Sequence, residues 1–122
     1  MKSIEVDFTK PGAAEPNKGH NRWHPDIPPR VEVELGEELV LGTRDGLDGQ
    51  LNERSTNEDV RALDLEVVHP LTGPVFVKGA EPGDILEVEI RAIEPEPTAC
   101  TAIIPGFGFL QTHFSFQWCG QQ

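Results

Sequence analysis

Proline and glycine interrupt this chain so often that it cannot fold around long helices. The 122 residues include 11 Pro and 12 Gly, spread along the whole length without a collagen-like period. A proline lacks the amide donor of a helix interior and pushes the residue before it out of helical geometry. The densest stretch, residues 9–30, therefore predicts an irregular surface arm. We place the arm at 1–30 and a β domain at 31–122.

Between these breaks, apolar side chains recur at every second position, which is the pattern of a half-buried strand. Turn residues separate such segments about every ten residues, and this spacing favours an all-β, antiparallel β-sandwich or barrel. One short helix is expected within 53–62, capped by Ser55 or Thr56. The alternation predicts burial of Val31, Val33, Leu65, Val67, Leu86, Val88 and Ile90.

Composition excludes several classes of protein. The formal net charge is −11, whereas binding to nucleic acid or to an anionic membrane surface needs clustered Lys and Arg. No stretch approaches the ~20 apolar residues of a membrane span, and the acidic N-terminus lacks the apolar segment of a signal peptide. Cys100 and Cys119 are too few for a disulfide framework or a cysteine zinc site. We therefore expect a cytoplasmic protein, with neither nucleic acid nor a membrane as its partner.

The last residues are unusual for a closed domain. Five aromatic side chains fall within residues 107–118, without strand periodicity, and they would expose apolar surface unless another segment covered it. We therefore expect the partial fold of a larger β-rich protein, which could be a truncation, a processed piece or one of two subunits.

Two segments carry residue types that could perform chemistry. In the first, HNRWHPDIPP at residues 20–29, His20 and His24 are four apart with Asp26 close behind. In an extended arm the two histidines lie about 13 Å apart, which is too far for both to bind one metal ion. A Pro-rich arm anchored by Trp23 is the alternative interpretation.

The second segment, TRDGLDGQ at residues 43–50, places two carboxylates and a carboxamide in a glycine-rich loop. Glycine lets the backbone approach a ligand closely, and carboxylate oxygens can hold a divalent cation. Asp-Gly is also a common turn, so an ordinary surface turn is the alternative. The loop does not match an EF-hand, and the chain lacks the GxSxG, GxxxxGK and HExxH motifs.

Four blocks of the sequence together resemble the acetamidase/formamidase family, in its longer, formamidase-like branch. They are HNRWHPDIPP (20–29), TRDGLDGQ (43–50), HPLTGPVFVKGAEPGDILEVEI (69–90) and IIPGFGFL (103–110). The resemblance implies a largely β fold. It also implies hydrolysis of the C–N bond of short aliphatic amides, which gives ammonia and a carboxylate.

The resemblance further implies a metal-assisted site with zinc as the expected ion, which would polarise the amide oxygen and supply hydroxide near neutral pH. Carried over to this chain, it makes Asp45 a catalytic carboxylate and a metal ligand. His20 becomes a catalytic residue and His24 a metal ligand. Gln50 and Asn21 become the substrate-binding residues.

Members of this family are considerably longer, and their GD-x-H and GDGE segments do not occur in this sequence. We therefore expect the chain alone to be inactive. We expect it to associate with the missing C-terminal part or to form a homo-oligomer, with a small amide as the substrate. Asp59 is a weaker candidate for the same site. A non-catalytic β-rich binding or oligomerisation module is the alternative function.

Overall fold

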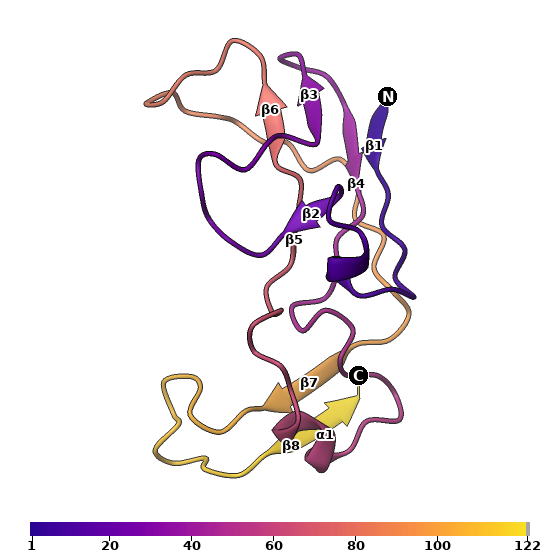
Figure 1. The fold of residues 1–122 in the computed structure, drawn as a ribbon, viewed down its shortest axis with the longest axis vertical. Helices are drawn as coiled ribbons and strands as arrows, with labels where there is room; N and C mark the ends of the chain where they lie inside the picture. Colours follow the sequence, from indigo (N-terminus) through magenta and orange to yellow (C-terminus); the bar gives the residue numbers. More distant parts are fainter. Residues whose placement is uncertain (122) are drawn as a thin grey trace. The chain divides into compact units, whose positions relative to one another are not determined.

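The structure is a computed structural model that describes residues 1–121. Within these residues the chain is largely β, with one short α-helix and one 3-10 segment between short strands (Figure 1). The helix α1 spans Asn57–Arg61, and the 3-10 segment η1 spans Gly12–Ala14. The strands are β1 (Lys2–Ile4), β2 (Gly19–His20), β3 (Val31–Val33), β4 (Leu39–Leu41), β5 (Leu71–Thr72), β6 (Val75–Val77), β7 (Cys100–Ile103) and β8 (Trp118–Gln121).

The strands pair two by two. β1 with β4 and β3 with β6 are parallel, whereas β2 with β5 and β7 with β8 are antiparallel. The predicted all-β class is therefore confirmed apart from α1. The predicted antiparallel sandwich or barrel is not found within residues 1–121, because these very short strands form four separate pairs, half of them parallel.

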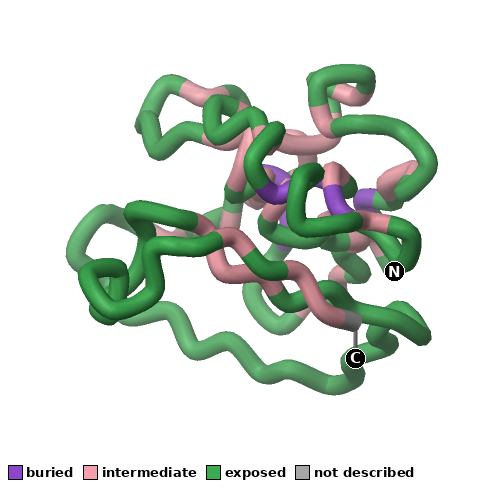
Figure 2. Tube along the Cα trace, turned by 90° about the horizontal axis from the view of Figure 1, so that it is seen from below, coloured by how far each residue is buried: buried purple, intermediate pink, exposed green. Residues whose placement is uncertain are grey.

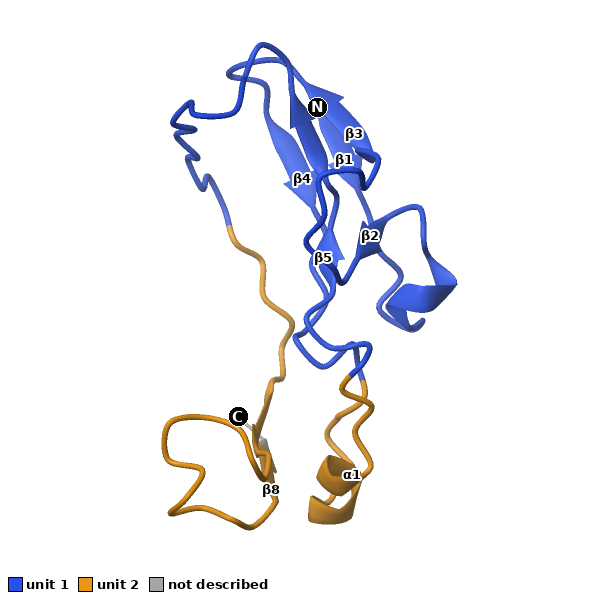
Figure 3. Cartoon of the chain, turned by 60° about the vertical axis from the view of Figure 1, so that its left-hand side comes forward, with its two compact units in different colours: residues 1–49, 66–92 blue, residues 50–65, 93–122 orange. Residues whose placement is uncertain are grey.

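The chain divides into two compact units (Figure 3). Unit 1 comprises residues 1–49 and 66–92, and unit 2 comprises residues 50–65 and 93–122. Unit 1 contains η1 and the strands β1 to β6, and unit 2 contains α1, β7 and β8. The boundary at residue 30 between an arm and a β domain stays a prediction.

The core of unit 1 is small and lies where β1 and β3 come into contact. Ile4 of β1 and Val33 of β3 are its buried apolar side chains. The prediction is confirmed for Val33, whereas Val31 and Val67 are only partly buried. Figure 2 shows that buried positions are few along the trace. In both parallel pairs the backbone hydrogen bonding extends one residue past the second strand. The N–H of Gly42, after β4, donates to Ile4 O at 2.9 Å, and the N–H of Lys78, after β6, donates to Val33 O at 2.9 Å. The first residues of the chain are thereby fixed against segments far along the sequence.

Two of the predicted strands do not form. Residues 63–67 contain a turn at 65–66 instead of a strand, and residues 84–92 have no regular structure, although both segments show the alternating pattern. Leu65, Leu86, Val88 and Ile90 are exposed, Val88 at 79% and Ile90 at 71%. Alternation indicates that a segment can be a strand, but a strand also needs a neighbouring backbone to pair with. No strand of the described chain pairs with either segment, so the predicted burial is wrong here.

In unit 2 the predicted helix is confirmed in a shorter form, α1. The carboxylate of Asp59 accepts hydrogen bonds from the N–H and the hydroxyl of Thr56, at 2.6 and 2.9 Å, which forms a capping box. Val60 of α1 is buried, as is Leu51, and Asn57 accepts a hydrogen bond from the N–H of Cys119 in β8 at 3.0 Å. No helix in residues 1–121 is both long and apolar enough to cross a membrane.

Candidate functional site

Unit 1 contains a cavity of about 360 Å³ to which both chemistry-bearing segments contribute. A volume of this size is typical of a small-molecule site. His20 and Asn21 come from the HNRWHPDIPP block, and Arg44 and Asp48 come from TRDGLDGQ. The remaining wall is formed by Val6, Gly12, Ala13, Glu15, Pro16, Lys18, Gly19, Arg30, Val67, Pro70, Leu71 and Thr72. The fold thus joins the two segments at one place, which the sequence spacing alone could not show.

His20 is placed at the cavity by the pairing of β2 with β5, in which it lies opposite Leu71. The two strands approach closely at Gly19, since a Cβ atom there would lie 2.5 Å from Leu71 O. The Nδ1 atom of His20 is 2.6 Å from the carbonyl oxygen of Arg22. A carbonyl oxygen only accepts, so Nδ1 carries a hydrogen, and the tautomer that fits this contact has Nε2 as its acceptor.

Asn21 follows directly and is held through its amide nitrogen, which donates to the carbonyl oxygen of Glu66 at 2.6 Å. Because the NH2 group makes this bond, the side-chain oxygen of Asn21 is the atom that suits a donor on a bound molecule. His20 and Asn21 therefore offer two hydrogen-bond acceptors at one cavity.

A cluster of buried charges forms another part of the wall. The guanidinium of Arg44 binds the carboxylate of Glu15 and lies 3.8 Å from that of Asp48. The side chains of Arg44, Glu15 and Asp48 are only 8%, 10% and 4% exposed. Hydrogen bonds from Lys18 and from the N–H of Asp7, together with the charges of Lys18 and Arg44, lower the pKa of Glu15. Glu15 is therefore a carboxylate at neutral pH.

These three residues were not among the predicted site residues. Arg44 and Asp48 flank Asp45 within the TRDGLDGQ block, so their position in a motif was an available signal. Lys18, three residues away, is a local partner of Glu15, but Arg44 is 29 residues away and meets Glu15 only in the folded chain, so the local sequence does not mark Glu15 as part of a site.

Asp45 is exposed and does not line the cavity. Its two carboxylate oxygens accept hydrogen bonds from the N–H groups of Leu47, at 2.8 Å, and Gly49, at 2.6 Å. The loop is further fixed by the N–H of His69, which donates to Gly46 O at 2.7 Å. The structure thus holds Asp45 in an ordered turn, beside the residues that line the cavity.

Two other predicted site residues lie away from the cavity wall. His24 is exposed, and its Nδ1 accepts a hydrogen bond from the N–H of Asp26 at 3.2 Å. Gln50 belongs to unit 2, where its side-chain amide donates to Asp64 O at 3.0 Å and accepts from Asp64 N at 2.8 Å. Asp59, the weaker candidate, caps α1, and the hydrogen bonds from Thr56 lower its pKa.

The predicted metal ligands can be compared with the side chains around them in the described part of the chain. Within residues 1–121, no three side chains of His, Cys, Asp or Glu are grouped closely enough to hold an ion. Asp45 uses both oxygens on backbone N–H groups, and Nδ1 of His24 is engaged with Asp26. Zinc, with Asp45 and His24 as its ligands, therefore stays a prediction.

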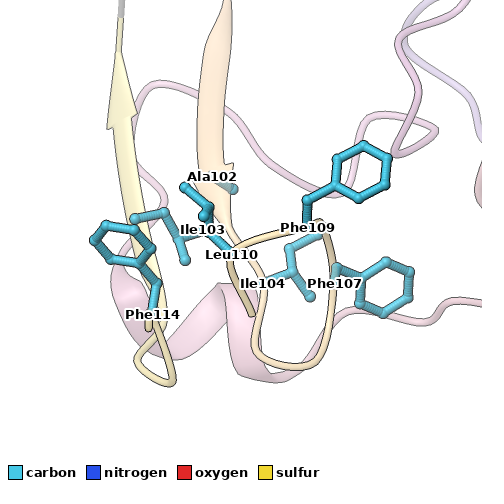
Figure 4. Close-up of a pocket in the computed structure, with 8 residues that line it drawn as sticks. Ala102, Ile103, Ile104, Phe107, Phe109, Leu110 and Phe114 are labelled. Atoms are coloured by element: carbon cyan, nitrogen blue, oxygen red, sulfur yellow. The ribbon is translucent and has the colours of Figure 1, made fainter. Parts of the chain in front are cut away.

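A second hollow, of about 560 Å³, lies in unit 2 and is lined almost entirely by apolar side chains (Figure 4). Its residues belong to β7 and to the IIPGFGFL block that follows, and Phe114 completes the wall. It presents no titratable side chain. This block of the motif therefore provides apolar surface rather than reactive groups.

Comparison with known proteins identifies the relatives of the chain. Residues 5–118 match the model of the Acetamidase/Formamidase family. The chain is 45% identical over 94 residues to an acetamidase of Mycolicibacterium smegmatis, covering 77% of this chain and 23% of that protein. It is 42% identical over 91 residues to a formamidase of Methylophilus methylotrophus, covering 74% of this chain and 22% of that protein.

Among solved structures, the chain is similar to a gamma lactamase from Delftia acidovorans. The TM-score is 0.81 at 38% sequence identity, and the match covers 99% of this chain and 31% of the lactamase. The chain spans about a quarter of the length of the curated relatives that it matches. The resemblance inferred from the four sequence blocks is confirmed: the chain belongs to the acetamidase/formamidase family.

Proposed function

We propose that this chain forms part of an enzyme that hydrolyses the C–N bond of short aliphatic amides, which releases ammonia and a carboxylate. The observation that carries the proposal is the cavity of unit 1, where His20 and Asn21 meet Arg44 and Asp48 from the second motif. The relatives named as acetamidase, formamidase and gamma lactamase support the reaction class. Since the chain spans about a quarter of its relatives, further site residues would come from polypeptide outside it.

His20 is the residue best suited to move the proton. Its Nε2, left as an acceptor by the bond from Nδ1 to Arg22 O, would take a proton from water as the water oxygen bonds to the amide carbon. The same nitrogen would then return the proton to the amide nitrogen as the C–N bond breaks. The oxygen of Asn21 would accept a hydrogen bond from the NH2 group of the substrate and so orient it.

Asp45 and Gln50 retain the roles that the resemblance implies, as a catalytic carboxylate and a substrate-binding amide. A zinc ion would polarise the amide oxygen and lower the pKa of a bound water. The described residues do not assemble a complete set of ligands, so Asp45 and His24 would need partners from outside this chain. Metal content and loss of activity with a chelator, measured on the complete protein, would test this part.

A second candidate function is supported by the exposed apolar residues. Leu86, Val88 and Ile90 of unit 1 and Phe107 and Phe109 of unit 2 are all more than half exposed. Such surface is typical of a module that binds another polypeptide. A purely structural module would leave the His20 cavity without a catalytic role.

Ammonia release from formamide, acetamide and propionamide separates the two functions. The assay compares the chain alone with the complete protein, meaning the longest natural polypeptide that contains this chain. We expect turnover by the complete protein and none by the chain alone. In the complete protein, His20→Gln should lower kcat at least 100-fold, the scale of a lost general base. The control His113→Gln changes an exposed histidine of unit 2. Equal turnover of His20→Gln and wild type would overturn the proposed role.

A further inference from the structure

The buried charges of unit 1 connect the N-terminal segment to the loop that carries Asp45. We call Glu15, Arg44 and Asp48 the arm–loop cluster. Arg44 donates to the carbonyl oxygen of Lys10, to that of Asp7 at 3.3 Å and to the carboxylate of Glu15. From the other end of the loop, Asp48 accepts the N–H of Gly12 on both oxygens, at 3.0 and 2.8 Å. The two segments are thus held together by charge-assisted bonds.

Close packing makes this junction specific. A Cβ atom on Gly12 would lie 3.3 Å from Oδ1 of Asp48, so the backbone of the N-terminal segment fits directly against that carboxylate. Asp48 has a φ of +56°, and His69, whose N–H bonds to Gly46 of the same loop, has a φ of +58°. They are the two non-glycine residues of the described chain with positive φ. Such conformations persist only where the surroundings enforce them, and they are frequent at functional sites.

Burying the three charged side chains of the arm–loop cluster carries a desolvation penalty that apolar side chains would not. Buried ion pairs are often no more stable than apolar side chains of the same volume, and their best-supported role is to fix one geometry. In the arm–loop cluster the charges lie immediately before and three residues after Asp45. The N–H groups of Leu47, which precedes Asp48, and of Gly49, which follows it, fix both oxygens of the Asp45 carboxylate. The exposed carboxylate is therefore carried by a turn with two buried anchors.

We propose that Glu15, Arg44 and Asp48 are positioning residues that hold the Asp45 carboxylate in its working orientation. This inference rests on the proposed function, in which Asp45 is the catalytic carboxylate. In this proposal the cluster acts through the 45–49 turn, although its three side chains also line the cavity of unit 1. Loss of one anchor should release the turn and leave the rest of the fold in place.

Two conservative variants test the anchors. Arg44→Lys keeps the charge, but one ammonium cannot reproduce the planar fork that reaches two carbonyl oxygens and a carboxylate. Asp48→Asn keeps the shape and tolerates positive φ, but it presents a single acceptor oxygen to Gly12 and loses the charge that faces Arg44. The matched control is Arg91→Lys in the same unit, because Arg91 is 66% exposed and makes only surface ion pairs.

The first measurement is amide hydrogen exchange of the 122-residue chain, which does not depend on activity. We expect exchange at Gly12, Leu47 and Gly49 to become at least tenfold faster in both anchor variants, with no change at Val60 of unit 2. The control should match wild type. Unchanged exchange at Leu47 and Gly49 would overturn the inference even if the complete protein proves to be an amidase.

The second measurement is a double-mutant cycle on kcat in the complete protein. We expect Arg44→Lys alone to lower kcat at least tenfold while KM changes less than threefold. Added to Asp45→Asn, the same change should lower kcat by less than twofold, because its effect passes through Asp45. If the two substitutions lowered kcat independently, so that their fold-losses multiplied in the double variant, Arg44 would have a merely structural role and the inference would be overturned. Absence of activity in wild type would instead overturn the proposed function, and the exchange data would still decide whether the cluster orders the turn.

Discussion

At the scale of single residues, Asp45 combines solvent exposure with a fixed carboxylate. An exposed acidic side chain usually samples several rotamers, but here both oxygens accept backbone N–H groups from within the next four residues. Leu47 and Gly49 thereby act as the local anchors of the carboxylate, and the arm–loop cluster acts behind them. A catalytic carboxylate needs a fixed orientation of this kind, and the Asp45 side chain of an ordinary turn would have it as well.

Asp45→Asn distinguishes these two roles. Asparagine retains one acceptor oxygen, so the variant loses one backbone hydrogen bond at an exposed position, and we expect a stability loss of about 1 kcal/mol. If the charge serves catalysis, kcat of the complete protein should fall at least 100-fold. Melting temperature and turnover are measured on the same preparation. The control Asp84→Asn changes another turn aspartate, which accepts the N–H of Glu81 at 2.8 Å. Normal turnover of Asp45→Asn would show that the Asp45 carboxylate is not catalytic and that the loop is only a structural turn.

At the scale of elements, the same alternating pattern has two outcomes. β3 becomes a strand because β6 lies beside it, with Val31 opposite Val75 and Val33 opposite Val77. Residues 84–92 alternate just as regularly but have no paired neighbour in the described chain. Backbone hydrogen bonds, rather than the pattern itself, therefore decide which segment is a strand.

This difference predicts effects of very different size on stability for two similar substitutions. Val33→Ala removes two methyl groups from a side chain that is 6% exposed, so we expect a loss of about 2 kcal/mol from lost burial and cavity formation. Val88→Ala changes a residue that is 79% exposed and should alter stability by no more than about 0.5 kcal/mol. Chemical denaturation of both variants of the chain provides the comparison. Similar losses would mean that residues 84–92 are buried in solution.

The helix α1 depends on its N-terminal cap, since five residues are too few for a helix to be stable alone. Asp59→Ala removes the acceptor for both donors of Thr56 and should lower stability by about 1 kcal/mol. Faster exchange at the buried Val60 would report the same loss. Glu58→Ala, on the exposed side of the same turn, should have a smaller effect. An equal effect of the two substitutions would contradict a special role for the cap.

At the scale of the whole chain, carboxylates dominate the charge, and several are stabilised in their ionised form. Hydrogen bonds from Thr56 lower the pKa of Asp59, and those from Glu34 N and Lys2 lower the pKa of Glu37. Lys18 and the N–H of Asp7 do the same for Glu15, and Lys10 with Thr9 does so for Asp7. The folded chain thus favours the ionised carboxylates more than the unfolded chain does.

Acid should therefore destabilise the fold. A carboxyl group whose pKa is lowered on folding contributes its full stabilisation above the unfolded value, which is 3.8 for Asp and 4.5 for Glu. As the pH falls below these values, that contribution is lost progressively down to the folded pKa. We expect the melting temperature to be steady from pH 6 to pH 5 and to fall below about pH 4.5. Glu15→Gln should have a shallower acid slope, and a melting temperature that rises on acidification would contradict the assignment.

The sequence by itself determined the features that depend on neighbouring residues. The density of Pro and Gly excluded long helices, and Ser55 or Thr56 was the predicted cap of a short helix, which the structure places at Thr56. The four blocks identified the family, because a motif is a property of the chain order. The sequence also named His20 and Asn21, which line the cavity in the structure.

Only the tertiary structure decided which of these local possibilities were used. The pairing of β1 with β4 and of β3 with β6 joins segments far apart in sequence, and alternation carries no information about the partner. For the same reason, the arm–loop cluster was not predictable, since Glu15 is an ordinary surface residue type until Arg44 is folded against it. Burial then turns an ion pair that would be weak in water into one that holds the 45–49 turn, because the surrounding protein screens charges far less than water does.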